Sequence, residues 1–284
     1  MKPVARHSAF TLIELLVVIS MIGILAAITM PTLSNFRKAD AMAAATRQLQ
    51  DDVERARQLA ISHRTTVYMV FCPSNFWADA SFAVLPAAEQ EKARRLYDKQ
   101  LAAYTFVTLR SVGNQPGQET PRYLSEWRML PEGAIIPLFK FKPRINQPNQ
   151  ATAIFDPPPP ATANRRFNVA GFSLTTDVPF PSEAAAPHYR LVNQKKTYIA
   201  LPYIAFNHLG QLTPQPFTWA DNSEFIPLAQ GRVAPALDVN KIPLQQPPTV
   251  VENPPGNSTN AFTLIRIDWL TGRARVEKQE LPPQ

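Results

Sequence analysis

One carboxylate interrupts a long apolar stretch near the start of the chain. From Phe10 to Met30 the residues are apolar or small, with Ser and Thr as the only other polar types, and Glu14 stands among them. An acidic side chain inside a membrane segment costs about 2.5–3.5 kcal/mol on insertion scales. Such a carboxylate is expensive only while it is unpaired, so Glu14 indicates an interaction partner for this segment. The alternative is a Glu14 that reaches the edge of the membrane in a plain anchor.

A pair of arginines near the other end of the chain could bind phosphate. Arg273 and Arg275 lie in the run Gly272-Arg273-Ala274-Arg275, and side chains two apart on a strand project to the same face. Two arginines supply only part of the phosphate contacts that a salt-sensitive DNA-binding protein uses. These arginines are expected in a β-hairpin. DNA is therefore a candidate partner of this segment, but a solvated basic hairpin is the favoured interpretation.

The sequence contains none of the motifs that carry common enzymatic chemistry. No G-x-S-x-G, G-x-G-x-x-G, Walker A, H-E-x-x-H or paired-cysteine metal spacing occurs, and the four histidines are scattered. The run Asp221-Asn222-Ser223-Glu224 could offer oxygens to calcium, but it lacks the fuller acidic spacing of a calcium loop. Cys72 is the single cysteine and is expected to be a small buried residue. We therefore predict no enzyme, no cofactor and no metal site.

Composition divides the chain into two parts. The 284 residues include 29 prolines and 9 glycines, yet only three prolines precede residue 75 and only one glycine precedes residue 112. The first quarter can therefore form an uninterrupted helix, whereas the rest is expected to be rich in loops and strands. The net charge is +7, or +5 without Lys2 and Arg6, and the excess is spread along the chain. This charge favours a solvated surface over a nucleic-acid or lipid partner.

The N-terminal part reads as one helix of about 80 Å. Residues 1–9 are short, polar and basic and are expected to stay cytoplasmic. Residues 10–31 are long and apolar enough to span a membrane. Residues 32–62 continue as an amphipathic helix, with apolar residues every three or four positions.

The remaining residues, 63–284, are predicted to form a β-rich head. Alternating β-branched and aromatic residues, with turn residues between them, are typical of antiparallel strands. A short charged helix is expected at 89–103, and proline-rich loops at 142–164 and 244–260. The strands are expected at 64–71, 104–110, 134–141, 196–207 and, as a hairpin, 261–276. The fold class is therefore α+β, with a long N-terminal helix packed on a C-terminal antiparallel sheet.

The N-terminus resembles the class III signal of type IV pilins and type II secretion pseudopilins. The resemblance rests on the run Ala9-Phe10-Thr11-Leu12-Ile13-Glu14 before a long apolar helix. It implies that a prepilin peptidase cuts between Ala9 and Phe10 and that the new amino group of Phe10 is methylated. It also makes Glu14 the acidic residue at the fifth mature position and Pro31 the helix-bending proline at the twenty-second. Ala9 departs from the family, where glycine usually precedes the cut.

Within the family the chain is most similar to the H-type minor pseudopilins, the GspH/FimT-like group. The similarity covers about half of the chain and rests on the order of short features. These are Ala56-Arg57-Gln58-Leu59-Ala60 before the first strand, Leu130 to Gly133, Ile204 to Gly210, and Gly272-Arg273. Gly272 to Arg275 is also similar to a G-R-x-R motif of DNA-uptake pilins.

The resemblance implies a structural protein of the bacterial inner membrane. It would cross the membrane once, with its N-terminus cytoplasmic and its head periplasmic or extracellular, and later join a filament. In the assembled filament, Glu14 of one subunit would meet the Phe10 amine of a neighbour. The implied partners are other pilin or pseudopilin subunits, the prepilin peptidase, the inner-membrane assembly platform and membrane lipid. A DNA-binding minor pilin and a major or adhesive pilin are the alternatives.

Overall fold

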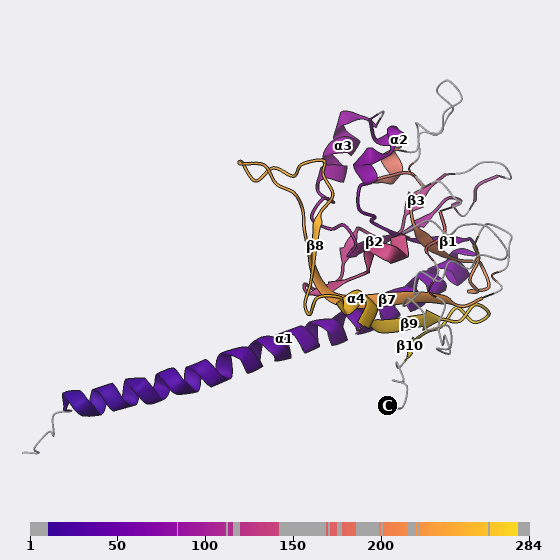
Figure 1. The fold of residues 1–284 in the computed structure, drawn as a ribbon. Helices are drawn as coiled ribbons and strands as arrows, with labels where there is room; N and C mark the ends of the chain where they lie inside the picture. The colour runs from indigo at the N-terminus through magenta and orange to yellow at the C-terminus, as the bar shows by residue number, and fades with distance from the viewer. Residues whose placement is uncertain are drawn as a thin grey trace, which may run out of the picture. The chain divides into compact units, whose positions relative to one another are not determined.

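The chain forms two compact units, residues 1–41 and 42–284. The computed structural model describes residues 11–83, 85–111, 113–115, 120–141, 169, 171–174, 178–185, 199, 201–214, 220, 222–260 and 262–277. Helix α1 (Leu12–His63) has 52 residues and contributes to both units. The α+β class with antiparallel sheets is confirmed (Figure 1). The loop predicted at 142–164 lies outside the described residues.

The described part of the first unit is helical. Its large apolar side chains between Leu12 and Leu25 are exposed. Among the residues that the structure describes, no helix combines the length and the apolar character that crossing a membrane requires. The membrane-spanning role of residues 10–31 stays a prediction.

The first sheet of the second unit is covered on both faces. Its strand order is β3-β2-β1-β6, with β4 also pairing with β2, and every pairing is antiparallel. Every residue of β1 and β2 is buried, as expected for strands packed on both sides. The strands are β1 (Val67–Phe71), β2 (Ala103–Thr108), β3 (Arg122–Tyr123), β4 (Arg128–Met129) and β6 (Tyr203–Phe206).

The second sheet is organised around one long strand. Its order is β10-β9-β7-β5, and β8 also pairs with β7, so β7 contacts three of the four other strands. The pairings are again antiparallel. The strands are β5 (Ala134–Ile135), β7 (Glu224–Ala234), β8 (Thr249–Glu252), β9 (Thr263–Ile267) and β10 (Ala274–Glu277).

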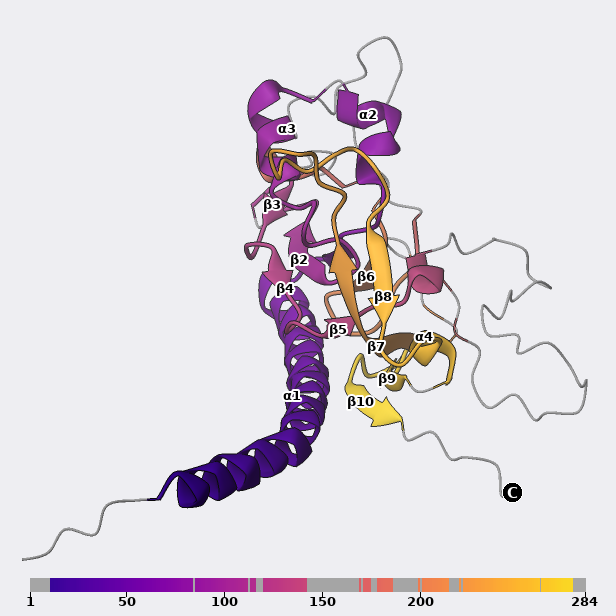
Figure 2. The same ribbon diagram turned by 60° about the vertical axis from the view of Figure 1, so that its left-hand side comes forward.

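Short helices complete the second unit. Figures 1 and 2 show α2 and α3 at one end of it, away from β9 and β10. The short helices are η1 (Phe76–Ala78), α2 (Ala80–Ala83), α3 (Ala87–Arg94), η2 (Leu138–Phe141) and α4 (Asn257–Asn260).

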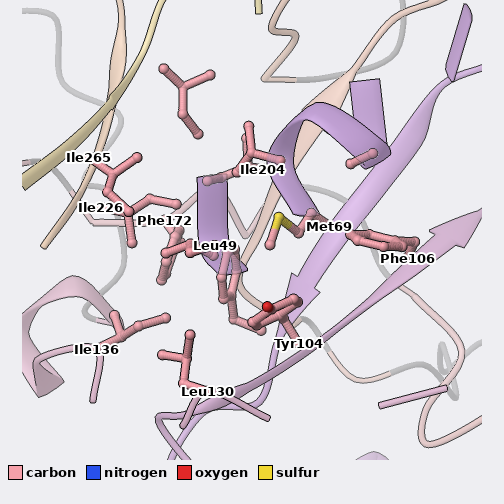
Figure 3. Packing of buried hydrophobic residues seen from close by; sticks show 14 of the residues in the cluster. Leu49, Met69, Tyr104, Phe106, Leu130, Ile136, Phe172, Ile204, Ile226 and Ile265 are labelled. Carbon is pink, nitrogen blue, oxygen red and sulfur yellow. The ribbon is translucent and has the colours of Figure 1, made fainter. Parts of the chain in front are cut away.

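The main core lies where the C-terminal part of α1 packs against both sheets. Successive strand residues point to opposite faces, so β1 places Val67, Met69 and Phe71 on this side. Helix α1 contributes the fully buried Leu49 and Val53 at helical spacing. Figure 3 shows Leu49 among side chains from both sheets, including Met69, Tyr104, Ile204, Ile226 and Ile265. One helix stripe therefore holds the two sheets together.

A second core lies on the other face of the first sheet. Tyr68 and Val70 of β1 point to this side, as does Cys72 after the strand. They pack with aromatic residues such as Phe76 and Phe180, whose ring centroids are 5.0 Å apart. Burial raises the pKa of the Cys72 thiol, as the prediction of a buried small residue requires.

A buried polar network also fixes α1 to the first sheet. Tyr104 Oη donates to Asp52 Oδ2 at 2.5 Å, and Arg128 Nε lies 3.0 Å from the same oxygen. Gln48 Nε2 donates to Tyr104 Oη and to the carbonyl of Met129. Burial, followed by the bond to Asp52, raises the pKa of Tyr104. The carboxylate of Asp52 is thus buried with two partners, as a buried charge requires.

Several predicted elements differ from the observed ones. The strand predicted at 134–141 ends at Ile135, because Pro137 follows and residues 138–141 form η2. The helix predicted at 89–103 is confirmed only as the shorter α3. The loop predicted at 244–260 is wrong, since this stretch contains β8 and α4. The prediction missed β7 altogether, because Pro227 and Gly231 break its strand pattern.

A buried ion pair connects η2 to the start of β7. Lys140 has a fully buried side chain, and its Nζ donates to Glu224 Oε1. The same Nζ lies 4.6 Å from the centroid of the Phe172 ring. Ammonium and carboxylate thus satisfy each other in a site with little access to water.

Removing one member of this pair should destabilise the second unit. Lys140→Met removes the ammonium that faces the buried Glu224 carboxylate, and breaking such a pair typically costs about 3–5 kcal/mol. The double variant Lys140→Met/Glu224→Leu removes both charges and should recover most of that loss. The measurement is the free energy of unfolding of the full chain in detergent, from denaturant titration. A double variant less stable than either single variant would contradict this account.

Candidate functional site

The N-terminal candidate site begins at the first turn of α1. Ala9 and Phe10 lie outside the described residues. Thr11 precedes the helix, and its N–H and Oγ1 both donate to Glu14 Oε2, at 2.9 and 2.8 Å. In return, the Glu14 N–H donates to Thr11 Oγ1 at 3.3 Å. This reciprocal arrangement is a capping box, in which the residue before a helix and the third helical residue satisfy each other's free backbone groups.

The capping box gives Glu14 a role that the sequence prediction missed. The signal was present, because Thr11-Leu12-Ile13-Glu14 has the T-x-x-E spacing of a capping box. A carboxylate in the first turn also interacts favourably with the positive end of the helix dipole. Glu14 is therefore held by its own chain before any second subunit meets it.

Pro31, the third residue of the predicted assembly site, lies within α1. The helix continues through it to His63. Residue 31 is thus a proline in a helix interior, where a proline has no N–H to donate to the backbone of the preceding turn.

The basic hairpin is the second candidate site. Arg275 lies in β10 opposite Arg266 of β9, and Glu277 Oε1 lies 3.4 Å from Arg275 Nε and 3.2 Å from Arg266 Nη1. The Glu277 carboxylate thus forms ion pairs with both Arg266 and Arg275. Arg273 is exposed, and within the described part of the chain its side chain has no ionic partner.

The tip of this hairpin is built around a carboxylate and a glycine. Asp268 Oδ1 accepts from the Thr271 N–H and Oγ1, both at 2.8 Å. The Thr271 N–H and then its hydroxyl hold the pKa of Asp268 below its usual range. The ionised Asp268 therefore stabilises the folded state. This stabilisation is present above the ordinary aspartate pKa and is lost as the pH falls through the lowered pKa of Asp268. Gly272 follows with a φ of +65°, a conformation that favours glycine.

The hairpin tip packs tightly on α1 and on the turn after β6. Arg57 Nε donates to the Thr271 carbonyl at 2.7 Å. A Cβ added to Gly272 would lie 2.0 Å from the Gly210 carbonyl oxygen, and one added to Gly210 would lie 2.8 Å from Ile61 Cδ1. At Gly272 the space is closed by backbone, whereas at Gly210 the nearest atoms belong to the Ile61 and Arg57 side chains and the positive φ of +79° favours glycine.

The structure therefore brings together residues that the sequence analysis named separately. Arg57, Gly210 and Gly272 belong to three short features far apart in the chain, and they meet in one contact. This gives Gly272 a structural role. It also ties the hairpin tip to the helix.

Charge around the basic hairpin is close to balanced. The Glu54 carboxylate accepts from the Ala274 N–H and lies 3.5 Å from Arg57. Glu277 lies between Arg266 and Arg275, and Asp268 is in the turn. A DNA-binding face typically gathers several unbalanced cations. This geometry favours a structural hairpin over a DNA-binding one.

The described residues also bear on metal binding. Within those residues no group of three or more His, Cys, Asp and Glu is placed to hold a metal ion. In the run of residues 221–224, where the acidic spacing disfavours a calcium loop, Asp221 lies outside the described residues and Glu224 pairs with Lys140.

Comparison with protein families identifies the N-terminal segment. Residues 4–30 match the family model of the prokaryotic N-terminal methylation motif. No curated protein and no solved structure matched the chain. The motif indicates a type IV pilin-like or pseudopilin subunit, a structural protein rather than an enzyme. It implies processing by prepilin peptidase and membrane-anchored assembly with other pilin subunits.

Filling the space at Gly272 should loosen the hairpin tip. Gly272→Ala places a Cβ against a backbone oxygen in a left-handed conformation, so we expect a loss of about 3 kcal/mol or more in stability. Gly113→Ala is a matched control, because Gly113 also has a positive φ but has open space around it. It should cost only about 1–2 kcal/mol, the strain of a side chain in a left-handed conformation. Equal losses in denaturant titrations of the two variants would show that the close approach is unimportant.

Proposed function

We propose that the chain is a minor pseudopilin, a structural subunit of a type II secretion or type IV pilus-like filament. The observation that carries this proposal is Glu14 at the first turn of a 52-residue helix, inside the methylation motif. The N-terminal part of α1 would lie in the inner membrane and then in the filament. Its C-terminal part carries the β-rich head.

The proposed assembly step is an exchange of partners at Glu14. In the single subunit, the carboxylate is bound to Thr11. After cleavage between Ala9 and Phe10, the new amino group is a cation that a neighbouring subunit can offer to this carboxylate. Between packed helices without water, such an ion pair is strongly favoured over either charge alone. Glu14 would thus set the register of each incoming subunit.

Two alternative functions have less support. A DNA-binding minor pilin would use Arg273 and Arg275, but Arg275 shares Glu277 with Arg266. Arg273 alone offers one phosphate contact, which is too few for useful affinity. A major or adhesive pilin has no specific observation in its favour.

Processing should produce a mature chain that begins at Phe10. The peptide bond between Ala9 and Phe10 joins a basic leader to the apolar run, where prepilin peptidase would cut. Mass spectrometry of the protein from its native host should find N-methyl-phenylalanine at the N-terminus. An intact Met1, or a start near Ile28, would exclude this kind of processing.

Two variants separate the charge of Glu14 from its capping role. Glu14→Gln retains a capping box, since glutamine also serves at that position, but it removes the charge. Thr11→Val removes the two hydrogen bonds made by the threonine hydroxyl and keeps the charge of Glu14. Loss of one member of a buried pair typically costs about 3–5 kcal/mol, whereas loss of a cap costs about 0.5–2 kcal/mol.

We therefore expect Glu14→Gln to reduce filament incorporation far more than Thr11→Val. The measurement is the fraction of the subunit in sheared filaments relative to the membrane fraction, at matched expression. If Thr11→Val is the more harmful change, capping rather than pairing is the role of Glu14.

A further inference from the structure

The end of β7, the segment that follows it and β8 form a long hairpin. We call residues 232–252 the β7–β8 arm, and Figure 1 shows its connecting segment extending outward from the rest of the second unit. The Leu244 N–H donates to the Ala236 carbonyl at 2.8 Å, and the Asp238 N–H donates to the Ile242 carbonyl at 2.9 Å. At the tip, Asp238 Oδ1 accepts from the Ile242 N–H at 2.8 Å. The arm is therefore held in shape by its own hydrogen bonds.

The β7–β8 arm has no buried residue. All of residues 232–252 are described, and each is exposed or half-buried. A two-stranded hairpin is only marginally stable in water unless it packs on something. Its large exposed apolar side chains nevertheless include Val239, which is 98% exposed, together with Leu237, Ile242, Leu244 and Val251. Apolar side chains gathered in this way mark a contact surface.

The apolar side chains of the arm lie on both of its faces. Residues 237 and 243 pair directly across the hairpin, so Leu237 and Pro243 are neighbours on one face. Side chains alternate between faces along a strand, so Ile242 and Leu244 lie on the opposite face, where Ala236 pairs with Leu244. Each face thus has its own contiguous apolar group. A partner that covered one face would leave the other in water.

The charge of the arm indicates the chemistry of its partner. Arg232 and Lys241 are balanced by Asp238 and Glu252, so the arm has no net charge. Nucleic acid and anionic headgroups attract surfaces with several unbalanced cations. The interior of a bilayer excludes open strand edges, and among the described strands β8 pairs only with β7. An apolar, uncharged protein surface therefore fits the arm best.

We infer that the β7–β8 arm lies between the heads of two neighbouring pilin subunits in the filament, with one neighbour against each face. This inference rests on the proposed function. The methylation motif implies assembly with other pilin subunits, so their heads are protein surfaces that this chain meets. Repeated head-to-tail contacts build an open helical array, in which a subunit has neighbours on more than one side. Such a position covers both apolar faces of the arm.

Photochemical cross-linking in the native host tests this placement. A benzophenone amino acid replaces Leu237 on one face of the arm or Ile242 on the other, in the full chain. After irradiation, adducts from both positions should appear in sheared filaments, and mass spectrometry should assign the attached peptides to the heads of chains that carry the methylation motif. The membrane fraction of the same cells is the internal control, because unassembled subunits should give no such adducts.

Charge substitutions assign the contact to the apolar side chains. Leu237→Asp and Ile242→Asp should each lower the fraction of the subunit in sheared filaments about tenfold, the factor expected from losing one buried apolar side chain. Asn240→Asp is the matched control, because it adds the same charge at an exposed polar position of the tip. It should change incorporation less than twofold. All three variants should keep the denaturation midpoint of the purified chain in detergent, since none alters a buried residue.

The outcomes separate this inference from the proposed function. If the unmodified chain is absent from sheared filaments, both are wrong. If the chain is present but gives adducts from neither face, or from one face only, the two-sided placement is wrong and the filament role stands. Adducts with lipid, equal adducts in the membrane fraction, or an equal loss of incorporation in Asn240→Asp and Ile242→Asp would also overturn the inference.

Discussion

The second unit depends on one stripe of α1 that is buried between two sheets. Leu49 and Val53 fill the centre of the stripe, and Ala45, Ala56 and Ala60 let the strands approach the helix closely. Replacing a buried leucine in such a core by alanine typically costs about 2–5 kcal/mol, since the cavity collapses only in part. Each sheet alone would leave an apolar face in water. The helix is thus the element that both sheets require.

Polar contacts along the same helix determine how the sheets are placed. Asp52 binds Tyr104 of the first sheet, and Arg57 binds the Thr271 carbonyl at the edge of the second. These two residues lie little more than one helical turn apart, so a small stretch of α1 aligns both sheets. Gly272 permits that approach because a Cβ there would meet the Gly210 carbonyl oxygen. The contact of Arg57 and Gly210 with the hairpin tip at Gly272 is therefore part of the same packing as the core.

Sequence reasoning recovered the elements with strong local signals. The long helix, β1, β2 and the β9–β10 hairpin follow from hydrophobic periodicity and turn residues. It missed β7, whose Pro227 pairs with Leu264 without interrupting the strand, because partners distant in sequence stabilise that strand. The contact of Arg57 with the hairpin tip could not be predicted either, since it joins residues 214 positions apart. At Glu14 the T-x-x-E spacing of a capping box was visible in the sequence, but Glu14 was interpreted only as a residue for subunit assembly.

The capping box changes the energetics of the proposed assembly. A carboxylate with no partner in lipid would carry the full cost of its charge, whereas Glu14 already accepts two hydrogen bonds from Thr11. The driving force for pairing with a neighbour's amine is then the difference between two bound states, and it is smaller than the whole cost of an unpaired charge. A smaller difference makes the exchange easier to reverse. In the proposed assembly, the subunit would therefore keep its helix start intact before it meets a neighbour, and it would still favour the register in which an amine replaces Thr11.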